Sequence, residues 1–577
     1  MGIGATRRTS RGERSTTLKS LLEFSSREGT VRGWNFAVIA FFLFVVLLPP
    51  LFILSFTVTG REDLQAYVFA DPAVLAQVGS AVALSFGVAL AVTAIDLVFG
   101  LPLAWFIVRR RFRGKAFLNT LIDAPLAVPT AGLGFSVALF WAANPAVSPP
   151  PLSPNFTNTP FLLLILLSFT TTFPYMVRSL AAILEQIETE YETAARTCGA
   201  APMTAARTVT LPLFRAGIAT GSILCLAKAL SDTGGVQAAL QIGRLFSISR
   251  ASCSYSGTPN ATVLIGAWRV IETACPTLAT PLNAAIAFVS MVMVVLSIPL
   301  LFIVKYVAAH AKFPLRRVWP GAERRLSRGA APRVRDGLAF GFLAFIVLVP
   351  SFFLVSFLAA GAPSGTADWG TFASSLALSF LIAGLATLID LAFGVPLALY
   401  IVRGPRRRLG TLLDSFVNVP YIVPSAALGF SLFLFWGPLV NTGTMPILVV
   451  LVLAHVAFTF PFIVRSAVGA LEEIDPGLDE TARTLGARPV QAFRRVTFPV
   501  IKPAILAGAI MAFTRSVGET GATLSVAPGV LTVPIFIVGL LNPATADYYL
   551  AALAVVALTA ISAAAIFGMR YVTRRAR

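Results

Sequence analysis

The sequence predicts an all-α integral membrane protein of about twelve transmembrane helices, built as two parallel six-helix repeats. The 577 residues are 56% hydrophobic and 12% charged, with a mean hydropathy of +0.81, whereas soluble domains carry about 25% charged residues. Several segments exceed the roughly 18 apolar residues that a membrane span needs. In addition, the second half of the chain repeats sequence patterns of the first half.

The first half is expected to contain six spans. A polar, Arg-rich tail (1–33) precedes them, and it shows no cleavable signal because the first apolar run is long enough to span. The tail is therefore expected to be cytoplasmic. The spans are expected at roughly Trp34–Phe56, Val78–Val108, Leu121–Trp141, Pro160–Leu180, Ala216–Ala239 and Leu282–Val304.

A basic linker (306–336) separates this first half (34–305) from the second half (337–577), in which the pattern restarts. Each half has an even number of spans, so the two copies share one orientation, and parallel repeats are related by an axis along the membrane normal. The second set of spans is expected at roughly Leu338–Leu358, Ser375–Val402, Leu412–Trp436, Met445–Ile463, Pro503–Leu524 and Tyr548–Gly568.

The formal net charge of +19 is explained by the membrane topology. Lys and Arg residues cluster beside the spans, and every basic cluster falls on the same side of the twelve-span arrangement, as the positive-inside rule requires. We therefore expect a multi-pass protein of the cell (inner or plasma) membrane with both termini in the cytoplasm. Membrane lipid, and not nucleic acid, is the expected partner of the basic residues.

Two polar loops interrupt the apolar pattern at matching places, Glu185–Ala216 and Glu472–Pro503. A constant offset of 287 residues relates Gly199 to Gly486 and Pro212 to Pro499. Such polar stretches do not lie in lipid. Each loop is expected to form two short helices outside the membrane, in which the glycine ends the first helix and the proline marks the return to the bilayer.

These loops resemble the coupling motif of permease subunits of binding-protein-dependent ABC importers, the EAA loop, in which E-A-A-x-x-x-G precedes a hydrophobic-Pro ending. The second loop contains Glu480-Thr481-Ala482 with Gly486, and the first contains Thr193-Ala194-Ala195 with Gly199. In the first loop the acidic residue stands one position earlier, at Glu192. The resemblance is found once in each half and so covers nearly the whole chain. It implies the type I ABC importer permease fold.

The resemblance also implies partners and roles. Each loop would dock as a coupling helix on a cytoplasmic ATP-binding cassette subunit, expected as a homodimer, and an external solute-binding protein would deliver the solute. The sequence contains no G-x-x-x-x-G-K-[ST] phosphate loop. ATP and Mg²⁺ are therefore expected on the partner, and this chain is expected to be a transport subunit without a cofactor. The implied coupling residues are Glu192, Ala194, Ala195, Gly199, Pro212, Glu480, Ala482, Gly486 and Pro499.

The solute is left open among ferric iron, thiamine and an oxyanion. Fusion of both halves in one chain is similar to ferric-iron and thiamine permeases, whereas the segment 516–526, which contains G-E-T-G-A, is more similar to molybdate, sulfate and thiamine permeases. A twelve-span, ion-coupled secondary transporter with Asp232 and Glu519 as ion sites is the alternative class. The duplicated polar loop favours the importer, because a secondary carrier needs no pair of ATPase-docking surfaces.

Four ionisable residues in the fifth and eleventh spans are candidates for the translocation path: Lys228, Asp232, Arg515 and Glu519. Acid and base stand four apart in each span, so they are expected on one helix face. Charged groups inside a membrane either face a polar pathway or pair with each other. A path lining and two structural ion pairs are both open on this pattern.

Asp96 and Asp390 form another matched pair, for which internal hydrogen bonding is favoured over solute binding because a buried carboxylate needs partners. Gly134 and Gly429 are expected to allow close helix approach.

Cys253 and Cys275 lie in an external segment that is longer than its counterpart in the second half, and a disulfide between them is expected on an oxidising face. Metal ligation by these cysteines is not favoured, since no histidine or second cysteine pair completes a tetrahedral site. The two histidines, His310 and His455, are isolated in the sequence, and no catalytic cluster is evident.

Overall fold

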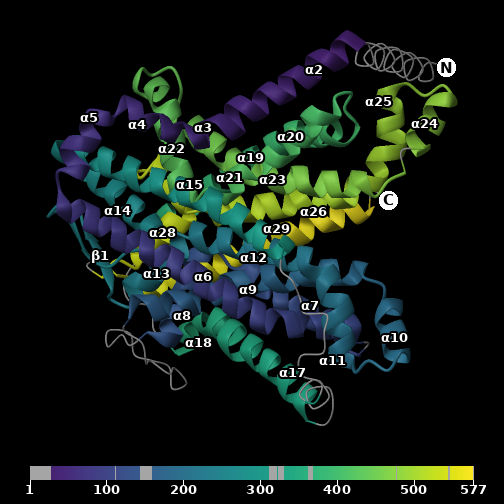
Figure 1. The fold of residues 1–577 in the computed structure, drawn as a ribbon. Coiled ribbons are helices and arrows are strands. Elements are labelled where there is room, and N and C mark those ends of the chain that lie inside the picture. The colour runs from purple at the N-terminus through teal and green to yellow at the C-terminus, as the bar shows by residue number, and fades with distance from the viewer. Residues whose placement is uncertain are drawn as a thin grey trace, which may run out of the picture.

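The computed structural model describes residues 28–110, 112–142, 159–310, 321, 330–360, 368–475, 477–543 and 546–575. Predictions for most of the N-terminal tail and of the basic linker lie outside these residues. Within them, nearly every element is a helix, and a single two-stranded sheet is present (Figure 1).

Among the described residues, the first half begins with a long apolar helical rod that is divided into short pieces, and it continues with three long apolar spans and two bent helix pairs. Its elements are α2 (Glu28–Phe41), η1 (Phe42–Leu47), α3 (Leu48–Phe52), η2 (Ile53–Ser55), α4 (Phe56–Thr59), α5 (Arg61–Leu64), η3 (Gln65–Phe69), α6 (Pro72–Arg109), α7 (Lys115–Asp123), η4 (Ala124–Ala127), α8 (Thr130–Trp141), α9 (Pro160–Gln186), α10 (Thr189–Thr197), α11 (Pro202–Ala205), η5 (Ala206–Thr210), α12 (Leu211–Ser231), α13 (Gly234–Ile242), β1 (Phe246–Ser249), β2 (Ser254–Gly257), α14 (Ala261–Ala274), η6 (Pro276–Leu278) and α15 (Ala279–His310).

The second half repeats this order without the β-hairpin. Its elements are α17 (Ala331–Gly341), η7 (Phe342–Leu348), α18 (Val349–Ala360), α19 (Trp369–Arg403), α20 (Arg407–Val417), α21 (Val419–Ile422), α22 (Ser425–Asn441), α23 (Ile447–Glu472), α24 (Gly477–Thr484), α25 (Pro489–Ala492), η8 (Phe493–Thr497), α26 (Phe498–Val517), α27 (Gly521–Val526), α28 (Val533–Leu540) and α29 (Tyr548–Arg575).

In the part of the chain that the structure describes, eight helices are long and apolar enough to cross a membrane, or up to eleven if each of three bent helix pairs is one span. The helix α29, with a shorter apolar part over Tyr548–Ala564, stands where the last span is predicted. The all-α membrane class is confirmed. Two of the bent pairs turn by 101° and 106° at Val128-Pro129 and Val423-Pro424. Proline forces an extended conformation on the residue before it, which breaks these predicted spans into two arms.

The predicted fifth and eleventh spans are too long. The helices end at Ser231 and Val517, not near Ala239 and Leu524, and short buried helices, α13 and α27, follow each break. The breaks carry the sequences Asp232-Thr233-Gly234-Gly235 and Gly518-Glu519-Thr520-Gly521. Glycine costs about 1 kcal/mol relative to alanine within a helix, and Asp and Thr side chains compete for backbone hydrogen bonds, so a helix ends here despite apolar flanks.

The first helices of the two halves are exchanged. The piece α3 packs against α22 of the second half, and α18 packs against α8 of the first half. Both hydrophobic cores consequently contain residues from both halves. In Figure 1, α2 accordingly lies beside the green helices of the second half and α17 beside the blue helices of the first.

Serine side chains fix this exchange. The Ser431 hydroxyl donates to the Pro49 carbonyl at 2.6 Å and accepts the Ile53 N–H at 2.9 Å, so it inserts into the backbone hydrogen bonding of the first rod. At the matching place, the Ser136 hydroxyl accepts the Leu354 N–H at 2.9 Å. Inserting a side chain into the helical ladder allows the rod to bend without leaving buried backbone groups unpaired.

Replacing Ser431 by alanine is expected to remove two buried hydrogen bonds, the one to the Pro49 carbonyl and the one from the Ile53 N–H. The expected loss of unfolding free energy is about 1–3 kcal/mol. It is measured as a lower melting temperature of the detergent-solubilised protein, with Ser415→Ala, an exposed serine of α20, as the control. Equal melting temperatures of the two variants would contradict this role of Ser431.

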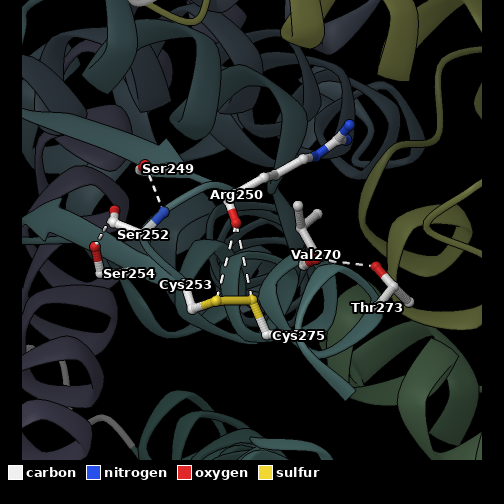
Figure 2. Close-up of a disulfide and its surroundings, with 8 residues drawn as sticks. All are labelled: Ser249, Arg250, Ser252, Cys253, Ser254, Val270, Thr273 and Cys275. Carbon is white, nitrogen blue, oxygen red and sulfur yellow. Dashed lines mark hydrogen bonds between the residues drawn. A yellow bond between two sulfur atoms is a disulfide. The ribbon is translucent and has the colours of Figure 1, made fainter. Parts of the chain in front are cut away.

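The first half contains a disulfide-linked β-hairpin, which has no counterpart among the described residues of the second half. The strands β1 and β2 pair antiparallel, with Phe246 opposite Gly257. A disulfide joins Cys253 to Cys275, whose Cα atoms are 6.1 Å apart, and so ties the hairpin to the end of α14 (Figure 2). The Arg250 carbonyl oxygen lies 3.9 Å and 3.8 Å from the two sulfurs. These are contacts and not hydrogen bonds, because a disulfide carries no S–H.

Candidate functional site

The two polar loops fold in the same way. The helices α10 and α24 each end at a glycine with a left-handed backbone, Gly199 (φ +86°) and Gly486 (φ +87°). The N–H of each glycine bonds to the carbonyl three residues back (3.0 Å), and the next N–H bonds to the carbonyl five residues back (3.1 Å and 3.0 Å). This is the Schellman C-cap, which an L-residue adopts only with strain.

Both loops lie on one side of the molecule. In Figure 1, α10 and α11 (blue) and α24 and α25 (yellow-green) project at the edge where α29 ends, opposite to β1 and α5. The predicted prolines, Pro212 and Pro499, stand in the first turn of the helices that leave the loops, α12 and α26. The loops therefore form two matched protrusions joined directly to the helices that reach the centre of the protein.

The acidic anchor of each loop is a carboxylate that holds the end of a long membrane helix. Glu192 accepts hydrogen bonds from Arg109 Nε (3.1 Å) and from the Thr210 hydroxyl (2.9 Å). In the second half Asp479 occupies this place: its oxygens lie 3.7 Å from Arg403 and 3.5 Å from the Thr497 hydroxyl.

The motif predicts Glu480 as the acidic residue of the second loop, because Glu480 heads the Glu-Thr-Ala triplet, but Glu480 is exposed. The offset of 287 residues, applied to Glu192, identifies Asp479.

Several other predicted coupling residues lie on the outer surface. Ala194 is exposed, whereas Ala195 and Ala482 are half-buried. Large apolar side chains are exposed beside them at matching positions, since Tyr191 is 53% and Leu478 is 50% exposed. Leu485, next to the turn at Gly486, is 84% exposed. Both loops thus expose large apolar side chains.

At the centre of the molecule the two helix breaks cross each other. A Cβ placed on Gly234 would lie 2.2 Å from Thr520 Oγ1, and one on Gly521 would lie 2.3 Å from Thr233 Oγ1. Each break thus needs its glycine because the threonine of the other half occupies that space. The Ser425 hydroxyl, which donates to the Ser231 carbonyl at 2.9 Å, adds a further bond between the halves.

A cavity lies beside this crossing, and about 380 Å³ of space there is not filled by atoms, open solvent included. Both cationic path candidates, Lys228 and Arg515, line it, whereas neither Asp232 nor Glu519 is among its described lining residues. The aromatic part of the lining comes from α9, α21 and α23, and consists of Tyr175, Tyr421, Phe458 and Phe462. The cavity therefore presents positive charge and hydroxyl groups at the meeting of the two halves.

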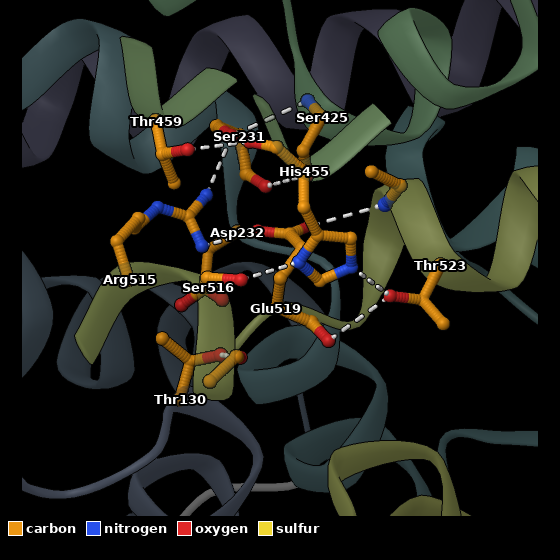
Figure 3. Close-up of polar contacts among 12 residues, drawn as sticks. Thr130, Ser231, Asp232, Ser425, His455, Thr459, Arg515, Ser516, Glu519 and Thr523 are labelled. Atoms are coloured by element: carbon orange, nitrogen blue, oxygen red, sulfur yellow. Dashed lines mark hydrogen bonds and ion pairs between the residues drawn. The ribbon is translucent and has the colours of Figure 1, made fainter. Parts of the chain in front are cut away.

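The two acid–base pairs differ, although they are equivalent in sequence. Glu519 forms an ion pair with Arg515 and also accepts the Ala522 N–H at 3.0 Å (Figure 3). Asp232 accepts the equivalent N–H, that of Gly235, at 3.4 Å, and its second oxygen has no partner within the described structure. The aspartate chain is one methylene shorter, and no ion pair with Lys228 forms. Structural pairing is thus observed in the second half and not in the first.

His455, which the sequence leaves isolated, belongs to this cluster. Its ring nitrogens lie 2.7 Å from the Ser516 hydroxyl and 3.0 Å from the Thr523 hydroxyl (Figure 3). Its counterpart in the first half is Ser168, by the offset of 287 residues. No local signal in the sequence indicates this role, because the partners stand 61 and 68 residues away.

Asp96 and Asp390 lie away from the described cavity lining. Both are fully buried and accept a hydroxyl hydrogen bond, Asp96 from Thr172 at 2.5 Å and Asp390 from Thr459 at 2.6 Å. These bonds join α6 to α9 and α19 to α23, as the prediction of internal hydrogen bonding requires.

Comparison with known families identifies the class. The model of the family described as "Binding-protein-dependent transport system inner membrane component" matches residues 96–312 and 391–577. The chain belongs to this family, and carries its domain twice in one polypeptide. It is therefore a multi-pass subunit of a membrane transport system and not an enzyme, and the predicted fused, two-half type I permease is confirmed. The family assignment replaces the secondary-transporter alternative.

Among curated relatives, the sulfate transport system permease protein CysT of Salmonella typhimurium is 35% identical over 161 residues, which are 26% of this chain and 57% of the relative. A probable molybdenum ABC transporter permease protein of Haloferax volcanii is 38% identical over 162 residues, 27% of this chain and 60% of the relative. This chain thus spans less than two thirds of the length of either. A probable CysT of Chlorokybus atmophyticus is 30% identical over 259 residues, 41% of this chain and 87% of the relative.

Proposed function

We propose that the protein is the fused permease of an ATP-driven ABC importer that moves a tetrahedral oxyanion of the sulfate or molybdate kind. The observation that carries the proposal is a cavity between the halves that is lined by Lys228 and Arg515. An external binding protein would deliver the anion. Both termini and the loops α10–α11 and α24–α25 would face the cytoplasm, where an ATPase dimer would bind the two loops.

The cavity lining favours an anion over the other two solutes. Ferric iron is a hard cation that requires oxygen acceptors such as carboxylates. Neither Asp232 nor Glu519 is among the described lining residues, and the Lys228 ammonium group would repel the ion. Thiamine is also a cation, so the ammonium group of Lys228 in the cavity lining would repel it as well. The names of the relatives, which are sulfate and molybdenum permeases, agree with an oxyanion.

The loops supply the mechanical link. Glu192 and Asp479 tie α10 and α24 to Arg109 and Arg403, at the ends of the membrane helices α6 and α19. A displacement of a docked loop would therefore be transmitted to a membrane helix as well as to α12 or α26, which begins in the loop itself. Closure of the ATPase dimer would move both loops together and separate the crossing breaks at Thr233 and Thr520.

Replacing Gly486 by valine is expected to weaken ATPase binding without preventing membrane insertion. A left-handed L-residue costs about 1–2 kcal/mol, which is a factor of about 5–30 in an equilibrium. The measurement is the amount of ATPase that co-purifies with the solubilised permease.

Gly443→Val is the matched control. Gly443 also has a left-handed backbone (φ +71°) with open space around it, but it lies between α22 and α23. Equal recovery of ATPase with both variants would contradict the docking role of the loop.

A further inference from the structure

We infer that the central cavity is an asymmetric oxyanion transit site, in which Lys228 of the first half binds the anion while Arg515 of the second half serves as a structural strut. This inference rests on the proposed function and assigns the binding of the solute to particular side chains. It follows from the different partners of two residues that occupy equivalent positions.

Lys228 has no ion-pair partner among the described residues, although the more distant carboxylates of Asp232 and Glu519 attract its charge. Its side chain is buried, with 7% of the residue exposed, and it lines the cavity. Among the described contacts its ammonium group makes no hydrogen bond or ion pair. A buried ammonium without a partner is costly, and the cost is removed when an anion enters and accepts charge-assisted hydrogen bonds.

Arg515 already has partners within the protein. It pairs with Glu519, which is 2% exposed, and its Nη2 lies 3.4 Å from the Ser231 hydroxyl. Its guanidinium also stands over the Phe458 ring, 5.2 Å from the ring centre. The Arg515–Glu519 pair has no net charge. It connects α26 to the turn before α27 and contacts the break of the first half.

Two tyrosines add hydroxyl donors to the cavity lining. The hydroxyls of Tyr175 and Tyr421 have no hydrogen-bond partner among the described residues, and both side chains line the cavity. Phe462 stands at the position equivalent to Tyr175 by the offset of 287 residues, so the second half lacks this hydroxyl. One ammonium and two phenol hydroxyls can all donate, which suits a sulfate or molybdate ion, because its oxygens only accept.

The fused chain makes this asymmetry possible. In a permease of two identical subunits each site residue would occur twice around the axis. Here Lys228 and Arg515, Tyr175 and Phe462, and Asp232 and Glu519 differ between the halves. The anion is therefore expected to bind near Lys228 of α12 and Tyr175 of α9 in the first half, with Tyr421 of α21 in the second half as a further donor.

The test uses the complete transporter in proteoliposomes, with its ATPase and binding protein, and follows ATP-dependent uptake of labelled sulfate and of labelled molybdate. Lys228→Gln is expected to reduce uptake about 10- to 100-fold, the value of a hydrogen bond to a charged group. Stimulation of the ATPase by the loaded binding protein should persist, since the loops are unchanged. Lys228→Arg should restore most of the uptake.

Lys502→Gln, a lysine of α26 that is absent from the described cavity lining, is the control and should transport like the wild type. Uptake by Lys228→Gln equal to that of Lys502→Gln would overturn the transit site while leaving the importer intact. Absence of ATP-dependent uptake of either anion by the wild type would overturn the proposed function itself. If Lys228→Gln fails to assemble, the Tyr175→Phe/Tyr421→Phe double variant decides: unchanged apparent KM for the anion would overturn the inference, and a several-fold increase would support it.

Discussion

Replacing Gly134 by alanine is expected to destabilise the protein strongly. A Cβ at Gly134 would lie 2.0 Å from the Gly235 carbonyl oxygen, and one at Gly429 would lie 2.6 Å from the Ala522 carbonyl oxygen. The obstructing atoms belong to the backbone at the start of α13 and α27, so no side-chain rotation can relieve the clash. Overpacking of a core costs about 1–3 kcal/mol when side chains can adjust, and we expect the upper end or more here.

The measurement is the melting temperature of the solubilised protein, together with its yield in the membrane fraction. Gly384→Ala is the matched control, because Gly384 lies within the membrane helix α19 and a Cβ there would meet nothing within 4 Å. Alanine is favoured over glycine within a helix by about 1 kcal/mol, so this control should keep or raise the melting temperature. A melting temperature for Gly134→Ala as high as that of the control would refute the close approach of α8 to α13.

Replacing Arg515 by glutamine is the second substitution with a large expected effect. Glu519 would remain buried without its ion-pair partner, and breaking a buried pair in this way costs about 3–5 kcal/mol. The double variant Arg515→Gln/Glu519→Gln is expected to recover much of this loss, because neither charge is then left alone. Melting temperatures of the two single variants and of the double variant give the coupling energy between the residues.

Lys228→Gln provides the internal comparison, since it is the equivalent substitution in the first half. It removes a buried charge that has no described ion-pair partner, so the melting temperature should stay the same or rise. If Lys228→Gln and Arg515→Gln lowered the melting temperature equally, the two residues would not have the different roles assigned to them, a structural ion pair for Arg515 and anion binding for Lys228. Stability therefore tests the asymmetry independently of transport.

In the two polar loops, some features follow from the local sequence and others do not. The turns at Gly199 and Gly486 follow from a glycine after a short polar helix, and the structure has both in the left-handed conformation. The acidic residue of the second loop that binds Arg403 does not follow from the motif alone. The motif triplet indicates Glu480, whereas the repeat offset of 287 residues indicates Asp479. Glu480, the acid of the triplet, lies on the exposed surface of α24. The ion pair with Arg403 is formed by Asp479, and it depends on which side of α24 faces the membrane helices.

By itself, the sequence determined the membrane class, the two repeats, most span positions and the two exposed loops. These features depend on composition, on segment length and on the cost of polar backbone in lipid, all of which are properties of short stretches. The tertiary structure was needed to show that α12 and α26 stop at the crossing breaks and that the first helices are exchanged. It was also needed to show that Arg515 forms an ion pair whereas Lys228 forms none among the described residues. Those outcomes depend on contacts such as Ser431 with Pro49, 382 residues apart, and on one methylene between Asp232 and Glu519. Neither hydrophobic periodicity nor residue type contains that information, because it arises when distant segments compete for the same space.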